Sequence, residues 1–196
     1  MAAIPSTAVI ELYQCCKPTA NIDVKSPATD VYNCIAYAMG SEDIWVASGG
    51  APYGWCAWWP AGVARDLTPE SLIAAFKAVG FEQCDNALPE AGYDKVVLYR
   101  RYDDKLKCVI WTHAARVVGV HRLHSKFGRI YDAQHNDGDV FEGYLYGEEY
   151  AYMRRRESDR NLTALQLPKQ SHVRFPDGEH LIVYQGAQIL RNIKLP

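Results

Sequence analysis

A cysteine at position 34 and a histidine at position 113 are of the residue types that together carry out covalent acyl transfer. Cys34 lies in SPATDVYNCIAYAMG, where apolar residues recur at helical spacing, so we predict a short amphipathic helix with Cys34 in its first turns. The free N–H groups and the dipole at that helix end favour a thiolate. A thiolate attacks a carbonyl carbon, and an imidazole activates the thiol and later protonates the leaving amine. The alternative for a helix cysteine is an inert place in the core.

The elements that would position these two groups follow from local signals. Pro27 is interpreted as a break, Asp30 as the N-cap of the helix and Gly40 as its C-terminal stop. The stretch VIWTHAARVV predicts a strand in which alternate residues share a face. Trp111 and His113 are therefore expected to point the same way.

A third polar group is needed to orient the imidazole. YDAQH resembles a strand end that brings polar groups into a site, so we favour His135 or Asp132, with His124 and Ser125 as alternatives. The oxyanion would be stabilised by backbone N–H groups near the start of the Cys34 helix, together with the side chain of Asn33.

A long segment rich in glycine and tryptophan follows the helix, at residues 41–65. Such a loop without periodicity is usually functional or disordered, and its aromatic residues argue against disorder. We expect Trp55, Trp58 and Trp59 to wall a substrate groove, with packing on the core as the alternative.

The remaining elements are predicted from periodicity and turn residues. A second helix is expected over residues 68–80, with Thr68 as N-cap and Pro69 as its first residue. Strands are expected at 95–100, 107–118, 120–127 and 130–135, and near the C-terminus at 172–175, 180–184 and 187–193. The three arginines at 154–156 are interpreted as a solvated helix end or an anion contact.

Composition limits the classes of partner. The chain has 196 residues, enough for one domain with its own core, and carries 21 Lys and Arg against 23 Asp and Glu, which does not indicate a nucleic-acid partner. The six cysteines form no CxxC pair. A metal site can be drawn from His121, His124, Asp132 and His135, but their spacing matches no strong ligand motif, so neither metal nor cofactor is expected.

The N-terminus has no basic region followed by a long apolar run, and no stretch reaches the roughly 18 apolar residues of a membrane helix. We therefore expect the protein to be made in the cytoplasm without membrane insertion. If it acts outside the cell, a specialised secretion system would have to export it to the periplasm of a target cell.

The pieces NCIAYAMG, THAAR, SKFG and the YG before YMRR resemble a group of bacterial domains related to the papain-like and NlpC-type cysteine hydrolases. The resemblance covers roughly residues 33–156. It implies an α+β fold, in which a Cys-bearing helix packs on an antiparallel sheet that presents the histidine. We accordingly expect one domain over residues 1–196, with a core at about 26–156 and a β-rich extension at 157–196.

The same resemblance implies cleavage or transfer at an amide bond, with Cys34 as nucleophile and His113 as base. No Asn stands where a papain-like motif would place one. Relatives often cleave peptidoglycan stem peptides, and some are secreted toxins, so the expected function is a bacterial peptidoglycan endopeptidase or amidase with an immunity or secretion-system protein as partner. The alternatives are a deamidase or transglutaminase-like toxin that modifies protein Gln or Asn, and a non-catalytic module that binds sugar or peptide through the Trp-rich loop.

Overall fold

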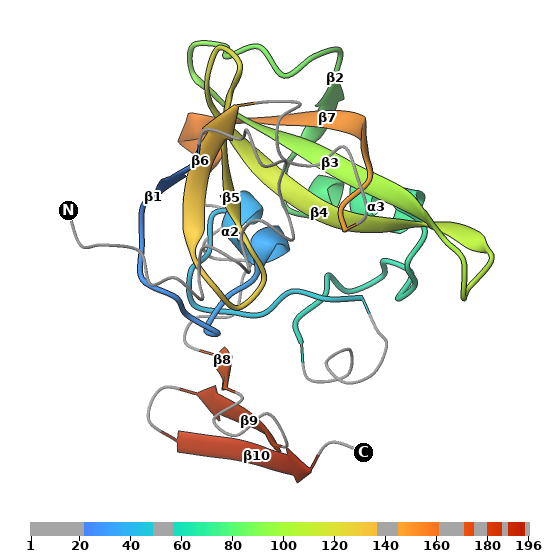
Figure 1. The fold of residues 1–196 in the computed structure, drawn as a ribbon, viewed down its shortest axis with the longest axis vertical. Helices are drawn as coiled ribbons and strands as arrows, with labels where there is room; N and C mark the ends of the chain where they lie inside the picture. The colour runs from blue at the N-terminus through green and yellow to red at the C-terminus, as the bar shows by residue number, and fades with distance from the viewer. Residues whose placement is uncertain are drawn as a thin grey trace.

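The computed structural model describes residues 22–48, 57–136 and 145–160, together with the strand backbones at 171–174, 180–185 and 188–194. A seven-stranded sheet in which every neighbouring pair is antiparallel dominates these residues (Figure 1). In spatial order its strands are β1 (Asp23–Val24), β6 (Asp132–Asn136), β5 (Arg122–Lys126), β4 (Cys108–Gly119), β3 (Tyr93–Asp103), β7 (Glu148–Arg156) and β2 (Glu82–Cys84).

Two short α-helices, α2 (Cys34–Met39) and α3 (Pro69–Ala78), pack on one side of this sheet. Both contact β4, and α2 also contacts β5. A single 3-10 turn, η1 (Glu157–Asp159), follows β7. Within the described part of the chain, strands therefore greatly outnumber helices.

The predicted papain-like α+β fold is wrong. The chain forms a predominantly antiparallel β-structure, in which the helices are only 6 and 10 residues long. Part of the misprediction comes from β7, where the sequence GYLYGEEYAYMRRRE showed no clear period of two. Residues Glu148–Arg156 of that segment form a nine-residue strand between β3 and β2, so the three arginines lie on a strand rather than at a helix end.

Local sequence signals predict the start of α3 correctly but not the start of α2. The start of α3 is confirmed, because the Thr68 side chain accepts a hydrogen bond from the Ser71 N–H and Pro69 is the first helical residue. The N-cap of α2 is Asn33 rather than Asp30, since the Asn33 side chain accepts from the Ala36 N–H. Gly40 ends α2 as expected, in a left-handed conformation with φ of 99°.

The sheet separates two clusters of buried side chains. We call the side that carries α2 and α3 the helical face, and it includes Val96, Leu98 and Ala114. The other side, which we call the opposite face, buries Val97, Tyr99 and Ala115, among others. The alternation along β3 and β4 thus sends neighbouring residues into different clusters.

Near the C-terminus, three strands form a separate antiparallel sheet in the order β10-β9-β8. They are β8 (Ser171–Arg174), β9 (His180–Gln185) and β10 (Gln188–Lys194). Each overlaps a strand that the sequence predicts.

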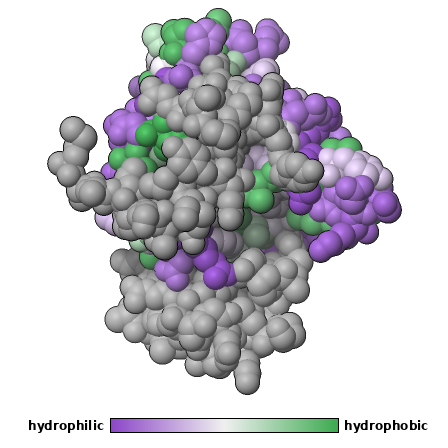
Figure 2. Space-filling view, viewed as in Figure 1, coloured by the Kyte–Doolittle hydropathy of each residue, from purple (hydrophilic) through white to green (hydrophobic). Residues whose placement is uncertain are grey.

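The β3–β4 hairpin projects beyond the body of the sheet (Figure 1). Its tip exposes Tyr102, Leu106 and Val109. Figure 2 shows hydrophobic residues on this view as small patches among hydrophilic ones. The apolar side chains that organise the described residues lie mainly inside, in the two clusters.

Candidate functional site

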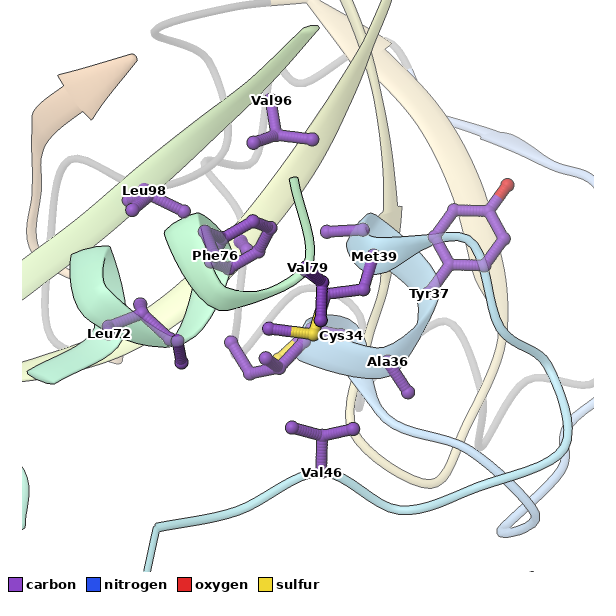
Figure 3. Packing of buried hydrophobic residues seen from close by; sticks show 14 of the residues in the cluster. Cys34, Ala36, Tyr37, Met39, Val46, Leu72, Phe76, Val79, Val96 and Leu98 are labelled. Carbon is purple, nitrogen blue, oxygen red and sulfur yellow. The ribbon is translucent and has the colours of Figure 1, made fainter. Parts of the chain in front are cut away.

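Cys34 is the first residue of α2, as its expected role requires, but its side chain is in the core. It is only 9% exposed and packs in the helical-face cluster with Phe76 of α3 and with Val79, which caps that helix (Figure 3). Burial raises the pKa of the Cys34 thiol to about 11, while the backbone N–H groups of Ala114 and Ile35 and the charge of Lys126 act the other way. The sulfur is therefore a thiol at neutral pH.

His113 lies on the opposite face of the sheet. Its ring is fully buried, 4.4 Å from the ring centre of Tyr146 and 5.6 Å from that of Tyr99. Burial lowers the pKa of His113 well below its usual value, and nearby His135 lowers it further. The structure does not bring Cys34 and His113 together, because the sheet itself lies between their clusters.

A β-bulge places Trp111 and His113 on different faces of the sheet. Tyr99 of β3 pairs with His113 and the next residue, Arg100, pairs with Trp111, so Thr112 is an extra residue on β4. Trp111 consequently packs on the helical face, and His113 on the other. The expectation that both side chains point the same way is wrong, since it assumed an unbroken period of two.

His135, one of the expected orienting residues, also belongs to the opposite face. Its Nε2 lies 2.8 Å from the Ser125 hydroxyl, and its Nδ1 lies 3.0 Å from the carbonyl oxygen of Asn136. The imidazole therefore donates from Nδ1 and accepts the Ser125 proton at Nε2. This buried pair holds β5 and β6 together.

Asp132 lies on the helical face and orients a different histidine. Its carboxylate accepts hydrogen bonds from His124 Nε2 at 2.9 Å, from the Tyr32 hydroxyl at 3.0 Å and from Ser26. The Tyr37 hydroxyl lies 2.9 Å from His124 Nδ1. Burial acts to raise the pKa of Asp132, but the bonds from His124, Ser26 and Tyr32 bring it below its usual value.

Lys126 completes the polar cluster around α2. Its side chain is buried, and Nζ donates to the carbonyl oxygens of Thr29, Gly128 and Ile130 at 2.7–2.8 Å. Burial lowers the pKa of Lys126 to about 8, so the ammonium form persists at neutral pH. All three ammonium protons have acceptors, and the lysine ties the segment before α2 to the β5–β6 turn.

The expected substrate-binding residues have structural roles where the structure describes them. Asn33 caps α2, and its side-chain amide also donates to the Val46 carbonyl oxygen at 2.7 Å. Trp59 is buried, and its ring stacks on that of Trp111 at 6.0 Å. Trp58 packs against the helical-face cluster, whereas Trp55 lies outside the described residues. The two described tryptophans thus support the packing alternative.

The structure does not bring together the three histidines and the aspartate that were considered as metal ligands. His124 and Asp132 share the helical face, whereas His135 is on the opposite face and His121 is exposed at the turn before β5. Within residues 22–48, 57–136 and 145–160, no group of three or more His, Cys, Asp or Glu side chains is placed to hold a metal ion.

A cavity of about 500 Å³ lies at the C-terminal end of α2, where sequence reasoning placed no site. Its charged lining comes from the segment after α2, from β3, β4 and β7, and from η1 and the residue after it: Glu42, Asp94, Lys95, Arg116, Arg155, Glu157 and Arg160. Arg155 is only 2% exposed, and donates to the Met39 carbonyl oxygen at 3.2 Å and to Asp94 at 3.0 Å. The run of three arginines was the one available signal, with the anion contact as one of its two interpretations.

A family model described as "Domain of unknown function (DUF7689)" matches residues 23–154. The chain belongs to this family. No curated protein and no solved structure matches it. In addition, no helix in the described ranges is long and apolar enough to cross a bilayer.

The DUF7689 match contains Cys34 and Lys126 of the helical face and His113 of the opposite face. It also contains Arg116 of the cavity but ends just before Arg155. The DUF7689 region therefore supplies most of the cavity wall, and the residues that follow it supply two further arginines.

Proposed function

We propose that the protein acts as a ligand-binding module whose site is the cavity at the end of α2. One observation carries this proposal: the cluster around Cys34 is internally satisfied, whereas the cavity gathers charged side chains around open space. Its volume of about 500 Å³ is within the range of ~300–1,000 Å³ typical of small-molecule sites. This is a binding role, as one sequence-based alternative expected, but at a different place from the Trp-rich loop.

Binding at the cavity can be tested with a library of small polar compounds and backbone-amide NMR of the full chain. Compounds that bind are expected to shift the amides of cavity-lining residues such as Gly40, Val96 and Val117. A Val118→Trp variant would obstruct the cavity and abolish those shifts. Val120→Trp is the matched control, because Val120 is 66% exposed and is not among the lining residues.

The proposal is contradicted if bound compounds shift only residues of the opposite face, such as Leu123. It is also contradicted if Val118→Trp and Val120→Trp bind equally well.

A cysteine hydrolase that cleaves an amide bond is the second candidate. The observation in its favour is the position of Cys34 at the start of α2, where the Ala114 and Ile35 N–H groups and the Lys126 charge partly offset the rise in the thiol pKa that burial causes. On this face the available imidazole is that of His124, oriented by Asp132. A deamidase would use the same chemistry, and differs by adding about one dalton to a protein substrate without breaking its chain.

Iodoacetamide labelling followed by mass spectrometry separates the two candidates, with exposed Cys108 as an internal reference. If Cys34 is an inert core thiol, it is expected to react more slowly than Cys108 and to reach the rate of Cys108 only after denaturation. Selective labelling of Cys34 in the native protein would instead favour the hydrolase. Loss of muropeptide cleavage or target-cell toxicity in a Cys34→Ala variant would then establish it.

A further inference from the structure

Arg155 lines the cavity with a buried guanidinium whose donors the described residues do not all use. A guanidinium has five N–H donors. Nη1 and Nη2 of Arg155 bond to Met39 and Asp94, whereas Nε has no partner among the described residues and is shielded from solvent. A buried charged donor without an acceptor is unfavourable, so the guanidinium is incompletely satisfied. A ligand would reach it at Nη2, which gives one of its two N–H groups to Asp94 and lies beside Gly40 of the cavity lining.

Arg116 brings a second guanidinium to the same place. Its Cζ lies 4.0 Å from the centre of the Tyr37 ring, and it forms no ion pair with a described carboxylate. A Cβ built on Gly40 would lie 3.4 Å from Nη2 of Arg155 and 4.0 Å from Nη2 of Arg116. The two guanidiniums therefore converge over a residue that has no side chain to occupy the space.

The charge balance of the cavity favours an anion. Four lining side chains are cationic and three are carboxylates, which leaves 4 − 3 = 1 positive charge. Asp94 already accepts from both Arg155 and Arg160. Burial lowers the pKa of Arg155, Asp94 offsets this, and the charges of Arg160 and Arg116 lower it further. This repulsion among guanidiniums is what a bound negative charge relieves.

We propose that the cavity binds a small organic acid, whose carboxylate or phosphate group lies between the guanidiniums of Arg116 and Arg155. This rests on the proposed binding function and adds the chemical class of the ligand. Arginine suits the role because its planar fork matches the oxygens of a carboxylate or phosphate. The carboxylates of Glu42 and Glu157 line the same cavity and limit the negative charge that it accepts.

Isothermal titration calorimetry on the full chain tests this inference, with succinate, inorganic phosphate and neutral succinamide as probes at constant ionic strength. Wild type is expected to bind succinate or phosphate, and the preferred probe identifies the group. Arg116→Ala should weaken binding about tenfold or more, and Arg116→Lys should retain part of the affinity. Arg100→Ala, which removes the same charge from an exposed part of β3, should bind as wild type does.

Glu42→Gln should instead raise the affinity for the anion a few-fold, because it removes a carboxylate that repels it.

The inference is overturned if Arg116→Ala binds as tightly as wild type, or if wild type binds neither anion. If succinamide shifts the Gly40 amide while the anions bind nowhere, the anion inference fails and the binding function stands. If anions bind with Arg116 but the Cys34 thiol is selectively alkylated, the anion site stands and the non-catalytic role fails.

Discussion

The helical face and the opposite face of the sheet use the same strands but hold different chemistry. The helical face buries a thiol beside a polar cluster in which Asp132, His124 and Lys126 have their partners. The opposite face buries His113 and His135 among aromatic rings. A cysteine and a histidine in the right order along a chain therefore form no dyad when the sheet lies between them, and one extra residue, Thr112, also sends Trp111 and His113 to different faces.

The largest expected effect comes from removing that extra residue. Deleting Thr112 would restore an unbroken alternation in β4 and turn the side chains on one side of the deletion to the wrong face. We expect no cooperative unfolding transition by circular dichroism. Thr112→Ser, which keeps the length and the hydroxyl that donates to the Tyr146 carbonyl oxygen, should unfold almost as wild type does. A stably folded deletion variant would show that the bulge does not set the two faces.

Neighbouring residues of β5 offer a matched comparison between the faces. Lys126→Met leaves three buried carbonyl oxygens without their donor and should lower the free energy of unfolding by about 3 kcal/mol. Ser125→Ala removes one hydrogen bond to His135 and should lower it by about 1 kcal/mol. Urea unfolding of both variants checks the order. Equal losses would mean that the Lys126 contacts contribute little to stability.

Alkaline pH should affect stability through the buried thiol of the helical face. The folded pKa of Cys34, about 11, is above its usual value of 9.0, so its contribution is complete below pH 9 and is lost as the pH rises towards 11. Two pKa units correspond to roughly 2–3 kcal/mol. The stability difference between wild type and Cys34→Ala, measured by urea unfolding, should shrink by that amount over this range. A constant difference would mean that the thiol is not buried.

Much of the fold follows from local sequence signals. Thr68 and Pro69 set the start of α3, and most of the strands are centred where alternation and turn residues place them. The N-cap of α2 was missed because Asn33, three residues after Asp30, makes the additional bond to Val46 that the sequence does not reveal. β7 was missed because its pairing on both sides outweighs its weak local pattern.

The candidate site was harder to predict, because it depends on long-range pairing. The bulge at Thr112 arises from the register of β3 against β4, and no residue type near it marks it in the sequence. The cavity gathers Gly40, Arg116 and Arg155 from three distant segments. The arginine run is visible in the sequence, but the burial of Arg155 and the position of Arg116 beside it depend on the fold.

The most direct test of the separation of the two faces is the NMR titration of His113, in wild type and in Cys34→Ala. The structure leads us to expect that His113 stays neutral down to a pH well below 6.5, with the same titration in both proteins. A His113 that titrates at or above 6.5 in wild type, and shifts when Cys34 is replaced, would show that the imidazole faces the thiol and would contradict the separation of the two side chains by the sheet.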